Sequence, residues 1–315
     1  MLSDDVALTL FTRIFANIHG FGCKLSVEIT NHDPAQTAYG TASLLRQYKG
    51  LDESPSLATH DYSEHLAPTV LAGIRASGAS LGCLDLGYTF RTPESWARYK
   101  QPLAWGAALP YWANLKILKI GLAHDVDLDL SHPFLRQCPL APMTAMLANL
   151  EELYVRQSSR STRRTTYYVG PTHIFGINLP ASRLRRLELE HLQCTELELD
   201  SLLRKHCKTL QELKLVHVAL RTSQDWRSIL SGVFRDLNLE NLDVSELTKC
   251  DNIGFGPLSL GILGGITISR WRGRDAVVEG ISSLIANSAY YANFDGDGKV
   301  IEAAENAFGQ SKCYC

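Results

Sequence analysis

Six short segments of this 315-residue chain share the pattern Leu-x-x-Leu-x-Leu, with Ile or Val in place of some of the later leucines. They begin at Leu81, Leu115, Leu150, Leu184, Leu210 and Leu239, so the pattern recurs after 34, 35, 34, 26 and 29 residues. A hydrophobic pattern that returns at such intervals is typical of stacked repeats, and this leucine spacing is that of the leucine-rich kind. It predicts an α/β fold, a leucine-rich-repeat solenoid (horseshoe) with parallel strands on its concave face and helices on its convex face.

The segments between these strands carry apolar residues at helical spacing. In 196–206 the apolar positions are 199, 202 and 203, and in 223–234 a stripe runs through 226, 229, 230, 233 and 234. Both patterns predict amphipathic helices that pack on the leucines. Further helices are predicted over 5–18, 66–75 and 276–287, with strands over 24–29 and 260–268.

We expect one domain, a solenoid over residues 1–290, followed by a C-terminal polar tail over 291–315. Residues 31–62 are rich in Asn, Asp, Pro, Gly and Ser and predict a loop-rich excursion, and 156–180 form a second insertion. The second insertion begins with four arginines among six Ser and Thr residues over 156–166. This composition is that of a regulatory or docking loop, and the alternative is a solvated insertion.

Charge and composition narrow the expected location of the chain. The net charge is −2 and the sequence pI is near 6.6, so no global charge attracts nucleic acid or an anionic membrane. No apolar run reaches the roughly 18 residues of a membrane helix, and the N-terminus carries acidic residues where a signal peptide carries basic ones. We therefore expect a monomer that is cytoplasmic or nuclear, without a membrane contact, and with its eight cysteines reduced.

The residues between the leucines are the candidate binding residues. Side chains alternate between the two faces of a strand, so these residues point away from the leucines. Over all such positions six acids face four bases, whereas a nucleic-acid reader needs a basic stripe, so we expect no nucleic-acid partner. Tyr and Arg are favoured anchors of protein interfaces, which favours a protein partner; the alternative is that the residues are merely solvated. The candidate protein-binding residues are Lys119, Glu152, Tyr154, Arg156, Arg186, Glu188, Glu190, Glu212, Lys214, Asn241 and Asp243.

Motifs of catalysis or cofactor binding are not found in the sequence. It contains no Gly-x-Ser-x-Gly, no phosphate-binding Gly-rich loop with Lys-Ser/Thr and no His-Glu-x-x-His, so we predict no enzyme and no cofactor. Asn293, Asp295 and Asp297, with Gly298, match the opening of a calcium loop. The twelfth position, which supplies a bidentate carboxylate in such loops, is Ala304. We therefore predict a polar turn here, with a calcium site as the alternative, and no other metal site.

A family resemblance is clearest over residues 179–247 and extends over roughly residues 1–290, where the segments that begin at Asn114 and Asn149 fit the same pattern. The strand at Leu184, the helix that ends at His206, the strand at Leu210 and the helix that opens at Asp225-Trp226 resemble the C-terminal half of fungal F-box and leucine-rich-repeat proteins. In that family an F-box recruits a cullin-type ubiquitin ligase and the repeats hold the substrate. The N-terminal Leu2–Val6 lacks the proline of the family's F-box, so the resemblance covers the repeat (substrate-recognition) region without a clear F-box.

The resemblance implies a non-catalytic protein–protein interaction scaffold that recognises a ubiquitin ligase substrate. The alternative is an orphan or truncated repeat domain with a structural or regulatory role and no ligase link.

Overall fold

The computed structural model describes residues 4–29, 69–87, 113–122, 147–157, 181–221, 226–245, 247–250, 261–262 and 269–291. Helices and mostly parallel strands make up these residues, so the predicted α/β architecture is confirmed. Two compact units divide the chain, Met1–His191 and Leu192–Cys315. The predicted excursion over 31–62, nearly all of the insertion over 156–180 and nearly all of the tail over 291–315 lie outside the described residues.

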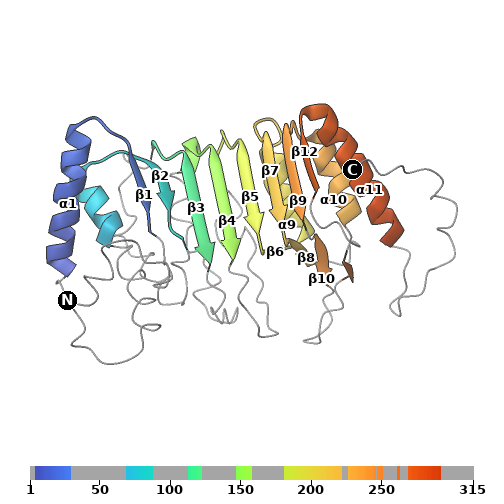
Figure 1. The fold of residues 1–315 in the computed structure, drawn as a ribbon, viewed down its shortest axis with the longest axis horizontal. Coiled ribbons are helices and arrows are strands. Elements are labelled where there is room, and N and C mark those ends of the chain that lie inside the picture. The colour runs from blue at the N-terminus through green and yellow to red at the C-terminus, as the bar shows by residue number, and fades with distance from the viewer. Residues whose placement is uncertain are drawn as a thin grey trace, which may run out of the picture. The chain divides into compact units, whose positions relative to one another are not determined.

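The first unit contains a parallel sheet whose strands follow one another in sequence order (Figure 1). β1 (Leu25–Glu28) pairs with β2 (Leu81–Asp85), followed by β3 (Ile117–Leu122), β4 (Glu152–Gln157) and β5 (Arg186–Glu190). The 3-10 helix η1 (Leu147–Asn149) leads into β4.

Two helices of the first unit pack against each other near β1. They are α1 (Asp4–Gly20) and a helix over residues 69–77, which correspond to the predicted helices over 5–18 and 66–75. A Cβ on Gly73 would lie 2.7 Å from the Cβ of Phe11, so this glycine permits the close approach of the two helices. Phe15 of α1 and Leu71 and Ile74 of the second helix are buried.

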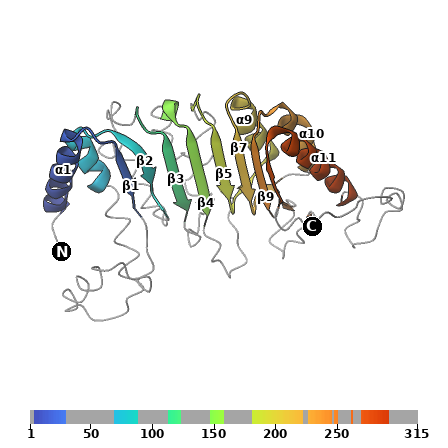
Figure 2. The same ribbon diagram turned by 45° about the horizontal axis from the view of Figure 1, so that its top comes forward.

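The second unit contains two groups of strands, and helices that are labelled in Figure 2. In one group β7 (Glu212–Val216) pairs in parallel with β9 (Asn241–Ser245), and β12 (Ser269–Arg272) pairs antiparallel with β9. The other group is a sheet in the order β11-β10-β8-β6, formed by Gly261–Ile262, Thr248–Cys250, Ala219–Arg221 and Gln193–Cys194. The helices are α9 (Glu196–Lys205), α10 (Trp226–Asp236) and α11 (Arg274–Tyr291); α10 packs against α9 and α11, and α11 packs against β12 and β9.

The start of α9 is fixed by a reciprocal cap. The Oγ1 of Thr195 accepts a hydrogen bond from the backbone N–H of Glu198 at 3.2 Å, and the Glu198 carboxylate accepts from the backbone N–H of Thr195 at 2.8 Å. Such a capping box satisfies backbone donors that a helix start otherwise leaves open. The apolar face of α9 buries Leu199 and Leu203, as its helical spacing predicts.

The leucines of the repeated segments form the core. The aliphatic residues at all three pattern positions of the six segments are at most 2% exposed, from Leu81 to Val244. The residues between them are more exposed along β4, β5 and β7, where burial alternates residue by residue. The prediction that the leucines point inward is therefore confirmed. Trp226 and Phe234 of α10 are buried as well and act as packing residues.

Equivalent positions of successive segments are joined by side-chain hydrogen bonds in the first unit. The residue before the first leucine donates to the preceding segment in two cases. Asn114 Nδ2 donates to Ser80 Oγ at 2.9 Å, and Asn149 Nδ2 donates to the Ala113 carbonyl at 2.7 Å. These bonds hold the strand starts level, so residues at the same place in the pattern become neighbours across the sheet.

Several strands were not predicted. The leucine pattern gives no indication of the β6, β8, β10 and β11 sheet, and the strand predicted over 260–268 is observed as β11 at 261–262, with 263–268 outside the described residues. Of the described helices, none has both the length and the apolar character needed to cross a membrane.

Candidate functional site

The parallel register of the first unit aligns the candidate residues in rows. We call these residues the polar face: the alternating positions of β3, β4 and β5 that point away from the leucines, together with Cys83 and Asp85 of β2. One row contains Cys83, Ile117, Glu152 and Arg186; the next contains Asp85, Lys119, Tyr154 and Glu188; the third contains Gly121, Arg156 and Glu190. Neighbouring strands lie about 4.8 Å apart, so side chains within a row are in reach of one another.

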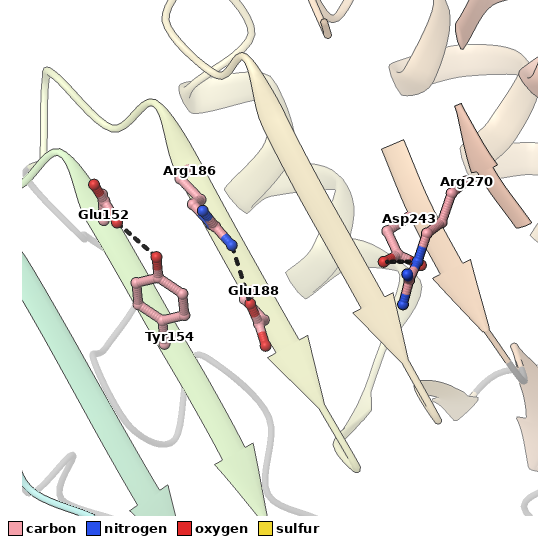
Figure 3. Close-up of polar contacts among 6 residues, drawn as sticks. All are labelled: Glu152, Tyr154, Arg186, Glu188, Asp243 and Arg270. Carbon is pink, nitrogen blue, oxygen red and sulfur yellow. Dashed lines mark hydrogen bonds and ion pairs between the residues drawn. The ribbon is translucent and has the colours of Figure 1, made fainter. Parts of the chain in front are cut away.

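Tyr154 occupies the middle of the polar face, with a cation on either neighbouring strand. Lys119 Nζ lies 5.6 Å from the centroid of its ring and Arg186 Cζ lies 5.2 Å from it. Both distances are within the range of cation–π attraction. The Tyr154 hydroxyl donates a hydrogen bond to Glu152 Oε2 at 2.6 Å (Figure 3). The ring is thereby held by contacts on three sides.

Burial and the neighbouring carboxylate also affect the acidity of this tyrosine. Desolvation raises the pKa of Tyr154, and the hydrogen bond to Glu152 raises it further, because both disfavour the phenolate. The hydroxyl therefore stays protonated over the physiological range and remains a donor. A neutral, half-buried tyrosine held in this way can contact a partner with its ring without losing its hydrogen bond.

Two carboxylates near the ring, those of Asp85 and Glu188, lie deeper than the cations that they pair with. Asp85 Oδ1 accepts from the backbone N–H of Gly87, which has a φ of +46°, and Asp85 Oδ2 lies 3.4 Å from Lys119 Nζ. The Asp85 side chain is 8% exposed against 39% for Lys119. In the same way Glu188, at 14%, lies 3.8 Å from Arg186, at 40% (Figure 3). In both pairs the cation is therefore the more exposed partner.

The remaining candidates of the first unit lie in the third row and are half-buried. Arg156 of β4 is level with Glu190 of β5, and Glu190 Oε1 lies 3.7 Å from the Nε2 of His191. His191 has a φ of +55°, which bends the chain as it leaves β5. His191 was not among the outward strand positions that the sequence predicts, whereas Asp85 was one of them.

The candidates of the second unit form rows of their own. Glu212 of β7 is level with Asn241 of β9, which is opposite Arg272 of β12. In the next row Lys214 is level with Asp243, which is opposite Arg270. Arg270 Nε donates to Asp243 Oδ2 at 2.8 Å (Figure 3).

Arg270 and Arg272 are site residues that the sequence analysis missed. The sequence pattern that could have identified them is the alternation Ser-Arg-Trp-Arg over 269–272, which places two arginines on one side of a strand and a tryptophan on the other. The segment lacks the leucine pattern, so it was not recognised as part of the sheet.

A metal site is not formed by the described residues, among which no group of three or more His, Cys, Asp or Glu side chains is placed to hold an ion. The calcium candidates Asn293, Asp295 and Asp297 lie outside the described residues. Cys23, Cys83, Cys194 and Cys207 are free thiols, as expected for reduced cysteines.

Comparisons with protein-family models, with curated proteins and with solved structures found no match to this chain. The function is therefore inferred from the geometry of the polar face of the first unit and of the rows on β7, β9 and β12.

Proposed function

We propose that the chain is a non-catalytic protein–protein interaction scaffold and that the polar face of the first unit binds a protein partner. The observation that carries this proposal is the placement of Tyr154 between Lys119 and Arg186. A tyrosine offers a large contact area with few rotatable bonds, and Tyr and Arg are enriched among the residues that dominate protein interfaces. The contacts around the ring preorganise it, so little conformational entropy is lost on binding.

The mixed charge of this face supports a protein partner over other classes. Acids and bases are mixed on this face, and two pairs of them, Lys119 with Asp85 and Arg186 with Glu188, are already engaged with one another. A nucleic acid needs a continuous run of cations to neutralise successive phosphates. A protein surface with its own mixed charges can match such a pattern and derive specificity from it.

The proposal extends to the architecture and the family. We infer a leucine-rich-repeat horseshoe, supported by the buried leucines and by the level strand starts within the first unit. On the resemblance of residues 179–247 to fungal F-box and leucine-rich-repeat proteins, the partner is a substrate of a cullin-type ubiquitin ligase. The resemblance is clearest over 179–247 but extends over the repeats of the first unit as well, and in that family the repeats hold the substrate.

Affinity capture from a fungal cell extract, followed by mass spectrometry, tests the proposal with four forms of the full chain. They are wild type, Tyr154→Ala, Tyr154→Phe and the control Lys116→Gln. Tyr154→Phe keeps the ring and loses only the hydroxyl. Lys116 is exposed and lies just before β3, where its Nζ pairs with Glu151 and not with Tyr154.

We expect a specific partner that wild type, Tyr154→Phe and Lys116→Gln retain and that Tyr154→Ala loses. An interface anchor is worth more than about 1 kcal/mol, which is at least a fivefold loss of affinity. Recovery of cullin-ligase subunits with the partner supports the adaptor role, and a partner without them supports a plain scaffold. If folded Tyr154→Ala captures the same proteins as wild type, the polar face of the first unit is not the binding surface.

A further inference from the structure

The strand β12 presents two arginines side by side on one surface of the second unit. Arg270 is opposite Asp243 and Arg272 is opposite Asn241, and in an antiparallel pair directly opposite residues share a face. Both arginines are exposed, and the Arg270 side chain is 63% exposed. In the strand order of the described residues β12 is the last member, so no further strand lies beside it there.

Packing on the opposite surface fixes the orientation of β12. Trp271 lies between the two arginines in sequence and points to the side where α11 packs. A Cβ on Gly280 of α11 would lie 2.4 Å from two ring atoms of Trp271, so the indole is seated directly against the helix backbone. A rotation of β12 that turned the arginines inward would break the packing of Trp271 against Gly280.

The charges around the arginines favour an anionic partner. Arg270 uses its Nε on Asp243 and retains the other donors of its guanidinium group. Arg272 is opposite the uncharged Asn241, and Lys214 is level with Asp243 on the next strand. The rows therefore hold Lys214, Arg270 and Arg272 against the carboxylates of Glu212 and Asp243, and the positive charge is concentrated on β12.

We propose that β12 is a docking site for an extended acidic segment of a partner protein, with carboxylates at alternate positions bound by Arg270 and Arg272. Residues two apart in a strand point the same way and lie about 6.7 Å apart, so alternate side chains of an extended partner have the same spacing as the two arginines. Arginine binds carboxylates through paired hydrogen bonds. The site is independent of the polar face of the first unit.

The carboxylates near the two arginines favour an acidic protein segment over a nucleic acid. Glu212 and Asp243 lie in the rows that end at Arg272 and Arg270, and their carboxylates repel a polyphosphate that runs across the strands. A short acidic peptide that runs along β12 meets the arginines first. An oligonucleotide is therefore the competing ligand in the test.

The probe is a fluorescein-labelled ten-residue peptide of alternating glutamate and serine, titrated with the full chain and followed by fluorescence anisotropy. A matched peptide with glutamine in place of glutamate and a single-stranded oligonucleotide of ten nucleotides are the comparison ligands. The variants are Arg272→Gln, Arg270→Gln and Arg272→Lys, with Lys205→Gln as a control that removes one charge from an exposed position of α9. Thermal melts establish that each variant is folded.

We expect the glutamate peptide to bind and the glutamine peptide and the oligonucleotide to bind at least about fivefold more weakly. Arg272→Gln and Arg270→Gln each weaken binding of the glutamate peptide by about fivefold, Arg272→Lys weakens it less, and Lys205→Gln and Tyr154→Ala leave it unchanged. Tighter binding of the oligonucleotide, equal binding of the two peptides or an equal effect of Lys205→Gln overturns the proposal. So does the absence of binding at about 1 mM protein, since the arginines would then serve only to keep an exposed strand solvated.

Discussion

Gly280 is the position where the structure makes the sharpest prediction about stability. In Gly280→Ala the new methyl group would lie 2.4 Å from Cδ2 and Cε2 and 2.7 Å from Cγ of Trp271. Ordinary contacts between carbon atoms are about 3.5–4.0 Å, so the indole must move by about 1 Å or α11 must separate from β12. Overpacking of this kind costs about 1–3 kcal/mol.

The helix propensity of alanine offsets part of that cost, because glycine in a helix interior is less favourable than alanine by about 1 kcal/mol. We therefore expect Gly280→Ala to lower the free energy of unfolding by up to about 2 kcal/mol. Urea denaturation followed by circular dichroism measures this value, and amide hydrogen exchange in α11 shows whether the loss is local.

Gly232 of α10 provides the matched control. A Cβ there would meet only Arg204 Nη2, at 3.5 Å, which is an ordinary contact with the end of a flexible side chain. Gly232→Ala should thus raise the free energy of unfolding by about 0.5–1 kcal/mol from helix propensity alone. The double variant Gly280→Ala/Trp271→Leu should lose less than the two single changes together, because the smaller side chain relieves the overlap. A Gly280→Ala protein as stable as the Gly232→Ala protein would refute the seating of Trp271 against α11.

Three further outcomes follow from the second unit and the cysteines. Thr195→Ala should lower the free energy of unfolding by about 1 kcal/mol in urea denaturation, whereas Thr195→Ser, which keeps the cap, should cost little. Burial raises the pKa of Glu198 above its ordinary value near 4.5, so the folded state holds this proton more tightly than the unfolded chain. The protonated Glu198 therefore contributes stability below about pH 4.5, and this contribution is lost as the pH rises through the pKa of Glu198 in the folded state. Glu198→Gln keeps the capping box and carries no charge, so its free energy of unfolding should increase relative to that of wild type as the pH rises through this range. Burial raises the pKa of Cys194 to about 12, so iodoacetamide at about pH 8 should label exposed Cys23 in the native protein and leave Cys194 unmodified, as read by peptide mass spectrometry.

Helices and parallel strands could be predicted from the sequence because one physical requirement sets both patterns. Leucines at strand spacing and apolar residues at helical spacing each form a face that must be buried. Helix ends depend on single capping residues, and for α9 these residues could be identified in the sequence. The predicted helix over 196–206 starts at Glu196 because Thr195 and Glu198 form the cap, and this Thr-x-x-Glu signal was present in the sequence.

β6, β8, β10 and β12 could not be predicted in this way, whereas β11 lies within the strand predicted over 260–268. These strands are two to four residues long, too short for periodicity to be distinguished from chance. The position of β12 depends on a contact made outside the strand, the fit of Trp271 against Gly280. Two residues nine apart in sequence give no pattern that identifies such a fit before the helix and strand are placed. Arg270 and Arg272 were consequently missed as site residues.

The neighbours of Tyr154, in contrast, are a consequence of the leucines. Leu153 is level with Leu187, and Tyr154 is therefore level with Glu188. A shift of β5 by one residue would turn Leu187 to the polar side and Glu188 into the core, because side chains alternate along a strand. Burial of a charged carboxylate without a partner costs several kcal/mol, so the core excludes a one-residue shift away from the observed register. That register places Arg186 close enough to contact the ring of Tyr154, and the same reasoning on β3 places Lys119. The leucines on the buried side of the strands thus determine which residues become neighbours of Tyr154 on the polar face.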